Sequence, residues 1–497
     1  MPRLVATALY TIGIVGLFYL DRRPRERTGA GLWAAFAWLF FVLSKGPAAW
    51  MQSGQTISYD GSYNMDSNPI NLVVFAVIIL SGLFVLGARW NRVAKSLQAS
   101  WPILLFYAYC GLSCAWSEYP DVVFKKWIRC LGDPIIILII LTEIEPATAL
   151  KRLYARLGFV LLPLSVLYIK YYPEIGRAYS NSWEYMYRGV TDHKNTLGSV
   201  CLVLGLGFLW RFLEHWQDKA DAHRRRHLIA DTVVLSITVW LLSVANSATS
   251  SVCFVSGVVI ILACRVRMVR RTPVALHLMI LGLVAVPVYT AYFQRDLVTA
   301  VGRNPTLTGR TDLWKQCLSI SGNPLVGSGF ESFWLGWRIQ KIWEWNPGIR
   351  LNEAHNGYLE MYLQLGWCGA TILAIIVARS YPRLARRIAS DVTLGPVTLA
   401  YMVAALNYNH TEAGFRVQSS VWVFFLLGTM SAAVLPKRTG SRLEKGLRAG
   451  DESLDLELRQ LTQPTVLPNE ASQLHWKKSP ACSTRTRPPF WLLSPDS

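Results

Sequence analysis

Long apolar segments recur along most of the chain, separated by short polar or basic stretches. Residues 69–87, 229–245 and 417–435 are clear examples. A helix needs about 17–25 predominantly apolar residues to cross a bilayer, and these segments reach that length with few charges. The pattern therefore predicts an all-α fold, that of a polytopic helical membrane protein.

Followed along the whole sequence, the same pattern predicts about 12–13 transmembrane helices. The first apolar segment has the position of a signal peptide, but it lacks a small-residue cleavage site and is followed at once by Arg22 and Arg23. We therefore interpret it as a membrane span. The predicted spans are residues 4–20, 30–50, 69–87, 100–116, 127–143, 157–172, 195–213, 228–245, 252–264, 274–292, 357–378, 392–408 and 417–435.

Basic residues are distributed unevenly between the two sides of this predicted topology. Six connections on one side carry 22 Lys and Arg, whereas the five short connections on the other side carry 6. Cytoplasmic loops are enriched in these residues, so the basic connections are predicted to be cytoplasmic. Topology thereby accounts for the formal net charge of +19, which does not indicate a nucleic-acid partner here.

Two regions depart from the pattern of short connections. Residues 293–356 form a long connection on the predicted periplasmic side, and a loop of this length is more often functional than structureless. Its apolar residues at helical spacing and its tryptophans predict amphipathic helices at the membrane surface. Residues 437–497 mix charge, Ser and Pro, which predicts a cytoplasmic, largely disordered tail after a transmembrane domain at 1–436.

Neither the cysteines nor the acidic residues show the spacing of a metal site. The nine cysteines lie mostly inside apolar segments, where they are expected to pack as small apolar side chains. Asp60 and Asp66 belong to a polar loop that is more typical of a turn. The sequence therefore predicts no cofactor and no metal.

His355 and Asn356 stand where the chain enters the apolar segment 357–378. A histidine in this position is either an interfacial side chain that hydrogen-bonds a neighbour or a reactive group held at the membrane surface. Asn352 is expected to cap the following helix, whose positive end would then lower the pKa of His355. The residues alone leave both interpretations open.

Four segments in order resemble the O-antigen ligase and polymerase superfamily. His355-Asn356 is followed after nine residues by Gly366-Trp367-Cys368-Gly369, which resembles the H-[NSQ]-x9-G-x-x-G pattern of that family. The segments 116–129, 188–198 and 308–330, with "WSEYPDVVFKKWIR", "RGVTDHKNTLG", "TGRTDLW" and "NPLVGSGF", resemble further family motifs. The resemblance extends from about residue 35 to residue 435.

The resemblance implies a membrane glycosyltransferase of the GT-C type in the bacterial inner membrane. Such an enzyme moves a glycan from an undecaprenyl (polyprenyl) diphosphate carrier to an acceptor hydroxyl at the periplasmic face. The acceptor would be lipid A-core, a growing polysaccharide or a protein, so ligation and polymerisation both stay open, with a polysaccharide assembly complex as an expected partner. A transporter or flippase, or a non-catalytic scaffold for envelope assembly, is the alternative.

The resemblance also suggests roles for individual residues. A histidine suits proton transfer from an acceptor hydroxyl, and arginines suit the oxygens of a departing diphosphate, so no metal would be required. The catalytic candidates are His355, as general base, and Arg310. The substrate-binding candidates are Arg188, His193, Lys194, Asn356, Lys126 and Arg129. Further loop arginines are Arg303, Arg338 and Arg350; His410, Glu412 and Arg416 are candidates for acceptor contacts, although an ordinary polar loop is the favoured interpretation there.

Overall fold

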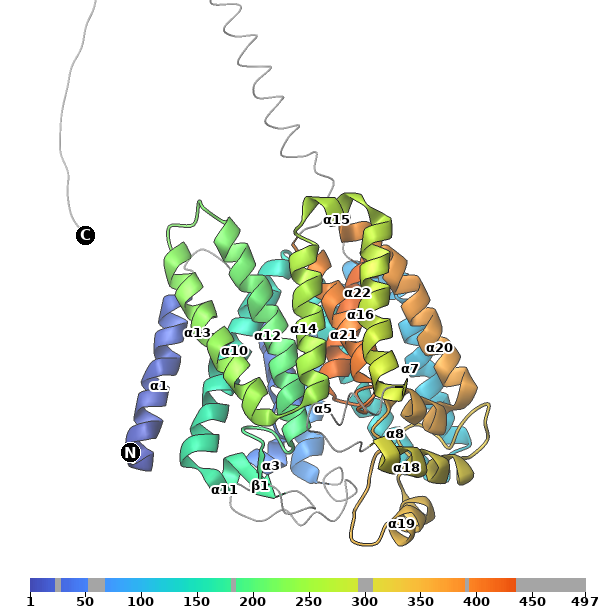
Figure 1. Cartoon of the computed structure of the whole chain (residues 1–497). Coiled ribbons are helices and arrows are strands. Elements are labelled where there is room, and N and C mark those ends of the chain that lie inside the picture. The colour runs from blue at the N-terminus through green and yellow to red at the C-terminus, as the bar shows by residue number, and fades with distance from the viewer. Residues whose placement is uncertain (23–27, 52–67, 180–184, 294–306, 389–392, 435–497) are drawn as a thin grey trace, which may run out of the picture. The chain divides into compact units, whose positions relative to one another are not determined.

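The computed structural model describes residues 1–22, 28–51, 68–179, 185–293, 307–388 and 393–434 (Figure 1). All of them belong to one unit of the chain, Met1–Arg438. The predicted tail at 437–497 lies outside the described residues, as do Asp60, Asp66 and Arg303. Helices dominate the described chain, and the prediction of a polytopic helical membrane protein is confirmed.

The elements follow one another along the chain with few long connections. The first part contains α1 (Arg3–Leu20), α2 (Leu32–Val42), α3 (Pro47–Met51), α5 (Pro69–Gly87), α6 (Trp90–Ala99), α7 (Trp101–Leu112), η1 (Ser113–Ala115), α8 (Pro120–Cys130), α9 (Gly132–Leu141), α10 (Pro146–Tyr171), α11 (Pro173–Gly176), β1 (Arg177–Tyr179) and β2 (Tyr185–Tyr187). The second part contains α12 (Lys194–Gln217), α13 (Arg224–Ala245), α14 (Ala248–Ala263), α15 (Arg267–Arg271), α16 (Pro273–Phe293), α18 (Leu307–Ser319), α19 (Gly336–Trp345), α20 (Gly357–Ile388), α21 (Gly395–Tyr408) and α22 (Ser420–Val434).

Each predicted span overlaps at least one helix, although several of these helices are short or divided. Among the described residues, six helices are long and apolar enough to cross a membrane, namely α1, α5, α10, α12, α13 and α20. The span predicted at 30–50 contains α2 and α3, and the one at 127–143 joins the end of α8 to α9. The number of crossings and their orientation therefore stay predictions.

Two kinds of helix make up the bundle. α12 packs against α10, α13, α14, α21 and α22, and all its side chains from Leu197 to Phe208 are buried. α1 instead buries only Ala6 and Leu17 of its 18 residues. A helix that is apolar all round is buried in protein or faces lipid, so α12 belongs to the core and α1 presents most of its surface to the bilayer.

The long connection contains ordered helices, as predicted for its described part. Figure 1 shows α18 and α19 at the same end of the bundle as α11 and β1, whereas α15 lies at the opposite end. We call residues 307–356 the loop subdomain. It shares a small apolar cluster with the start of α20, formed by Leu313, Cys317, Phe333, Trp334, Ile339, Ile342, Ala354 and Leu363.

α20 is broken at Gly366, inside the segment 357–378 that the sequence predicts as one membrane span. Gly366 has φ 64° and ψ −164°, and a Cβ there would lie 2.3 Å from the carbonyl of Leu325. The segment 324–329 enters the break and pairs the backbone groups that the helix leaves unpaired, as buried polar groups require. Its hydrogen bonds are Ser328 N–H to Leu363 O, Gly329 N–H to Gln364 O, Trp367 N–H to Pro324 O and Cys368 N–H to Leu325 O.

The all-α prediction misses one short hairpin. β1 and β2 pair antiparallel, with Arg177 opposite Tyr187 and Tyr179 opposite Tyr185. The rings of Tyr179 and Tyr185 meet edge to face with centroids 4.9 Å apart. The hairpin follows α11 closely, and it lies at the same end of the bundle as the loop subdomain (Figure 1).

Candidate functional site

The backbone at His355 is held in an unusual conformation directly before α20. His355 has φ 50°, in the left-handed region that costs a non-glycine residue free energy and often marks a functional site. The side chain of Asn356 accepts hydrogen bonds from the N–H groups of Tyr358 and Leu359 at 3.0 and 3.1 Å. Asn356, and not the predicted Asn352, is therefore the N-cap of α20, and His355 lies before the helix.

A close approach between two loops brings Glu412 to His355. The N–H of Gly357 donates to the carbonyls of Asn409 and Glu412, and a Cβ on Gly357 would lie 1.7 Å from the side-chain oxygen of Asn409. That oxygen in turn accepts from the backbone N–H groups of Gly414 and Phe415 at 2.8 Å. The 409–419 segment between α21 and α22 is thus fixed against the start of α20.

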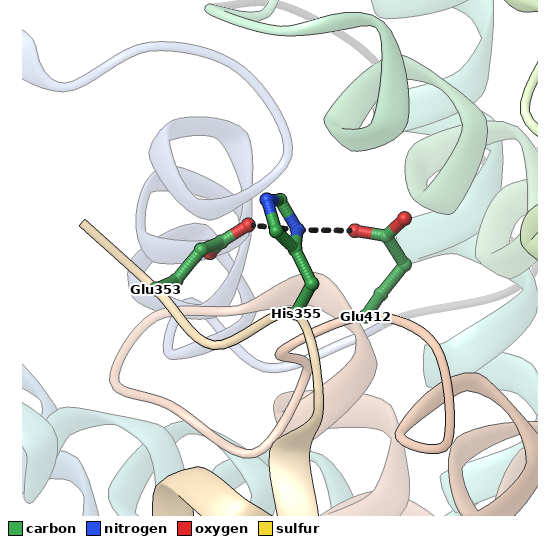
Figure 2. A group of neighbouring side chains, drawn as sticks. All are labelled: Glu353, His355 and Glu412. Atoms are coloured by element: carbon green, nitrogen blue, oxygen red, sulfur yellow. Dashed lines mark hydrogen bonds and ion pairs between the residues drawn. The ribbon is translucent and has the colours of Figure 1, made fainter. Parts of the chain in front are cut away.

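His355 lies between two carboxylates, as Figure 2 shows. Its Nδ1 is 2.9 Å from Glu353 Oε1 and 3.4 Å from Glu412 Oε2. Within the described part of the chain, Nε2 has no hydrogen-bond partner, and 26% of the side chain is exposed. The nitrogen that the protein does not use is therefore the one available to a ligand.

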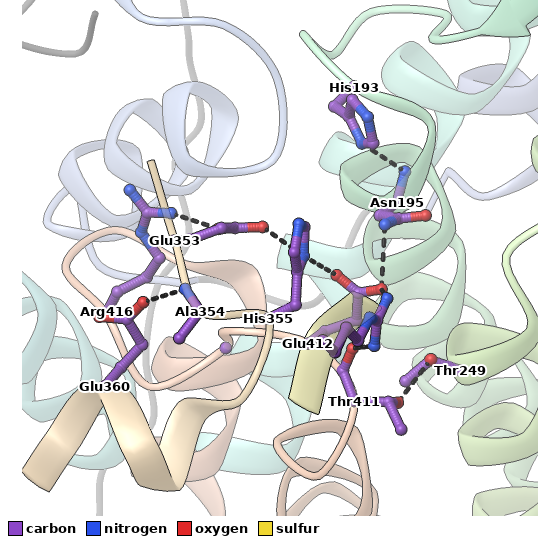
Figure 3. Close-up of polar contacts among 12 residues, drawn as sticks. His193, Asn195, Thr249, Glu353, Ala354, His355, Glu360, Thr411, Glu412 and Arg416 are labelled. Carbon is purple, nitrogen blue, oxygen red and sulfur yellow. Dashed lines mark hydrogen bonds and ion pairs between the residues drawn. The ribbon is translucent and has the colours of Figure 1, made fainter. Parts of the chain in front are cut away.

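Arginines and an asparagine surround the outer oxygens of these carboxylates (Figure 3). Arg416 Nη1 donates to Glu353 Oε2 at 2.7 Å, and Arg310 Nη2 lies 3.5 Å from Glu412 Oε1. Arg310 also donates to the carbonyl of Thr411. Asn195 Nδ2 donates to Glu412 Oε1 at 3.0 Å. The first turn of α12, the loop subdomain and the 409–419 segment thus meet at one histidine.

The two carboxylates reverse the electrostatic prediction for His355. Burial alone would lower its pKa, but hydrogen bonds and charge from Glu353 and Glu412 raise the pKa to about 10. Burial would raise the pKa of Glu353, but the hydrogen bond and charge of His355, together with the charge of Arg416, lower the pKa to about 2. The prediction of a lowered histidine pKa is wrong, because the histidine precedes the helix and faces two anions. At neutral pH His355 is an imidazolium.

The charge balance of this cluster bears on metal binding. Glu353, His355 and Glu412 place one potential ligand atom each within 4.8 Å of one another. However, the imidazolium and the guanidinium groups of Arg310 and Arg416 already supply three positive charges against two carboxylates. A divalent cation would have to displace the Nδ1 proton and enter a site with excess positive charge. An anion fits the cluster better.

His193 lies beside the cluster, whereas Arg188 is used by the backbone. His193 caps α12 by accepting the N–H of Asn195 on Nδ1 at 3.2 Å, and burial lowers its pKa. Lys194 is the first residue of α12. Arg188 Nε donates to the carbonyl of Ile175 in α11 at 2.9 Å, and thus joins the end of the hairpin to the helix before it. These three residues come from one segment but have different surroundings.

On α8, Arg129 contacts the 409–419 segment directly, whereas Lys126 contacts Glu331 of the loop subdomain. Lys126 Nζ lies 3.6 Å from Glu331, whose carboxylate accepts the N–H of Val417 at 3.3 Å. Arg129 Nε donates to Gln418 Oε1 at 2.7 Å. Arg129 is thus bonded to the 409–419 segment directly, and Lys126 is joined to it through Glu331.

The other loop arginines have structural partners. Arg338 is buried, with Nη2 2.6 Å from Glu118, and Arg350 stacks over the ring of Trp343 at 4.5 Å. Neither is joined to the His355 cluster by these contacts. The described site therefore uses Arg310 together with Arg416, for which the sequence had favoured the interpretation of an ordinary polar loop.

Sequence reasoning missed two members of the site and undervalued a third. Glu353, two residues before His355, was not considered, and Asn195 was not considered although it lies in the recognised segment 188–198. Glu412 was assigned only to acceptor contacts. The unusual density of charged and polar residues in 352–356 and 409–416 was the available signal, but no spacing rule joins segments so far apart in the sequence.

Comparison with known proteins shows similarity to O-antigen and exopolysaccharide proteins. Residues 232–374 match a family model described as O-antigen ligase, a range that contains Arg310 and His355 and ends before Glu412. The exopolysaccharide production protein ExoQ of Rhizobium meliloti (strain 1021) is 24% identical over 352 residues. That similarity covers 68% of this chain and 77% of the relative.

Proposed function

We propose that this chain, which is similar to O-antigen ligases and to the exopolysaccharide production protein ExoQ, transfers a glycan from a polyprenyl diphosphate carrier to an acceptor hydroxyl. The superfamily and the ExoQ relative support a function in O-antigen or exopolysaccharide ligation or polymerisation. The diphosphate donor and the outer face of the inner membrane are the finer parts of the proposal. The cations around His355 support the diphosphate donor, and the uneven distribution of basic residues between the connections supports the outer face.

In this proposal the departing diphosphate binds the cation cluster. Breaking the glycosyl–oxygen bond leaves negative charge on the diphosphate, and fixed cations lower the barrier by stabilising that charge. Arg310 and Arg416 are partly exposed, at 25% and 37% of their side chains, and each is held by a carboxylate that fixes its direction. Imidazolium Nε2–H of His355 adds a third donor.

The proton-transfer role proposed for His355 changes accordingly. An imidazolium cannot accept the proton of the attacking hydroxyl, so His355 acts as a donor and a cation, not as a general base. Glu353, with 22% of its side chain exposed, is placed to accept the hydrogen bond of the hydroxyl. The new glycosidic bond forms as the glycosyl–diphosphate bond breaks, and the hydroxyl proton ends on the diphosphate.

We propose further that the reaction needs no divalent metal. Metal ions serve related chemistry by neutralising diphosphate oxygens, and in this site Arg310, Arg416 and His355 carry that charge. The proposal rests on the charge balance and on the ion pairs that occupy the carboxylates.

The experiment that tests the proposal is transfer by the purified protein in lipid, with a polyprenyl-diphosphate-linked oligosaccharide as donor and either lipid A-core or an exopolysaccharide fragment as acceptor. Formation of the glycosylated acceptor with release of polyprenyl diphosphate is the expected result, and the acceptor used separates ligase from polymerase. A transporter would move the intact donor across a vesicle without cleaving it, and a scaffold would do neither.

The predicted orientation has its own test. A reporter fused after Ser321, in the loop subdomain, should report a periplasmic position, and one fused after Arg386, near the end of α20, a cytoplasmic one. The prediction rests on the uneven distribution of basic residues between the connections. The opposite result at either fusion would place the His355 cluster on the wrong side for this donor.

A further inference from the structure

A basic cavity lies at the junction of α1, α10 and α12, apart from the His355 cluster. Its volume is about 280 Å³, which corresponds to roughly nine water molecules at about 30 Å³ each and accommodates a phosphate with part of a headgroup. Five cationic side chains line it, together with Asp21, Phe18 and Ala155. The cations are Arg22, Lys151, Arg152, Arg156 and Arg211.

The carboxylates around this cavity do not balance its cations. Asp21 pairs with Arg211 at 2.8 Å, and Arg211 pairs also with Asp231 at 3.0 Å. Glu214 lies 3.6 Å from Lys151. Even with Asp231 and Glu214, which do not line the cavity, the described residues place three carboxylates beside five cations.

Arg152, which donates to Thr28 Oγ1 at 3.1 Å, and Arg156 line the cavity from α10. They lie one turn apart and therefore on the same face of α10. The guanidinium of Arg156 stacks over Trp33 at 4.0 Å, while its buried Nη1 has no hydrogen-bond partner among the described residues. A buried guanidinium N–H without an acceptor is costly, and a phosphate oxygen in the cavity would satisfy it.

The cavity also borders the surface that faces lipid. Phe18, which lines it, belongs to α1, and 40% of that side chain is exposed. Val15, one turn earlier, is 62% exposed. Apolar side chains thus lead directly from the basic cavity along a helix of membrane-spanning length. A ligand with an anionic head and acyl chains matches both features, and basic pockets between membrane helices bind such lipids.

From these observations we propose that the cavity between α1, α10 and α12 binds the phosphate of an anionic phospholipid, with the acyl chains along α1. Arg152, Arg156 and Arg22 contact the phosphate, and Arg211 with Asp21 forms the wall that joins the three helices. Bound lipid then holds α1, which buries little of its own surface, against the bundle. The site is independent of the transfer reaction proposed for His355.

The test compares the melting temperature of the full chain in phosphatidylcholine nanodiscs with and without phosphatidylglycerol. Phosphatidylglycerol should raise it, because a ligand that binds the folded state stabilises it by mass action. The double variant Arg152→Gln/Arg156→Gln should lose most of that rise. Its affinity for phosphatidylglycerol in a titration should fall about 25-fold, from roughly fivefold for each cation near an anionic surface.

The matched control is Arg267→Gln/Arg271→Gln, which removes two exposed arginines from α15. In this variant phosphatidylglycerol should raise the melting temperature as much as in the wild type. Equal losses in both double variants, or no rise in the wild type, would overturn the proposal. If the α10 variant does not fold, Arg22→Gln replaces it, since Arg22 is exposed. This variant should show a smaller increase in melting temperature with phosphatidylglycerol than the wild type, and an undiminished increase would overturn the proposal. Inorganic phosphate at matched concentration should leave the melting temperature unchanged. A higher melting temperature with phosphate alone would mean that the cavity binds a free anion and would overturn the proposal of a lipid ligand.

Discussion

His355 and Arg211 are the centres of two charge clusters made from the same kinds of residues. Around Arg211 two of the partners lie on helices and are buried: Asp231 on α13 is inaccessible, and His215 Nδ1 on α12 is 2.7 Å from it. Around His355 both carboxylate partners lie on connecting segments, Glu353 is partly exposed and Glu412 buried, and the histidine has a left-handed backbone. A buried ion pair between two helices stabilises a fold, whereas a partly exposed histidine at the junction of connecting segments is suited to a substrate.

The largest effect expected from this comparison is on stability at Arg211. Replacing Asp231 by Ala leaves Arg211 and His215 without their shared buried carboxylate, and breaking such a pair costs about 3–5 kcal/mol. Thermal unfolding of the purified variant, or its amount in the membrane, measures this. His355→Ala is the control and should unfold close to the wild type. Equal destabilisation of both would remove the distinction between the clusters.

Transfer activity should respond in the opposite way. Arg310→Ala should remain folded in the membrane and lose about 10²–10³ in rate, the scale of about 2.7–4 kcal/mol for one donor to developing charge. Arg310→Lys should restore little, because lysine lacks the planar fork of arginine. Arg350→Ala, which removes an arginine stacked on Trp343, is the control. Full activity of Arg310→Ala would exclude Arg310 from the reaction.

The break in α20 at Gly366 holds segment 324–329 of the loop subdomain against this helix. Substitution of Gly366 tests the break, with a smaller expected effect on stability. Gly366→Ala places a Cβ 2.3 Å from the carbonyl of Leu325 at a positive φ, which should cost about 1–3 kcal/mol. Gly87→Ala, at the end of α5 with nothing within 4 Å of the added Cβ, should be nearly neutral. Thermal unfolding compares them, and similar behaviour of the two would mean that the break is not required.

The smallest expected effect is that of metal removal. Transfer should survive excess EDTA, because Arg310, Arg416 and His355 already provide the positive charge that a metal would bring. The measurement is the rate before and after chelation and dialysis. Loss with EDTA and recovery with Mg²⁺ or Mn²⁺ would instead make Glu353, His355 and Glu412, which lie within ligand distance of one another, the ligand set.

The sequence was sufficient for the class of fold and for the position of His355. Continuous apolar segments dictate helices because a backbone in lipid must pair with itself, so the segment at 69–87 was predicted to the residue. Gly366 was recognised as part of the family pattern, but the break in α20 was not predicted. A glycine with positive φ looks like any other glycine in a sequence. The three-residue strands β1 and β2 leave even less signal in the sequence.

The electrostatics of the site could not be predicted for a different reason. The pKa of His355 depends on Glu412, 57 residues away, and on Glu353, whose direction is set by Arg416. A helix N-terminus is a local feature that a sequence displays, and it suggested a lowered pKa. The closer and stronger effect comes from side chains that only the tertiary structure brings together.

The most direct test of the account is the dependence of the transfer rate on pH for the wild type and Glu412→Gln. If the imidazolium of His355 is the active form, the wild-type rate is retained from neutral pH upward and falls as the pH rises through the histidine pKa of about 10. Removing the charge of Glu412 lowers that pKa, so the fall should move to lower pH in Glu412→Gln. A wild-type rate that rises through an ionisation near 6.5 and then stays level would contradict the account and restore His355 as a general base.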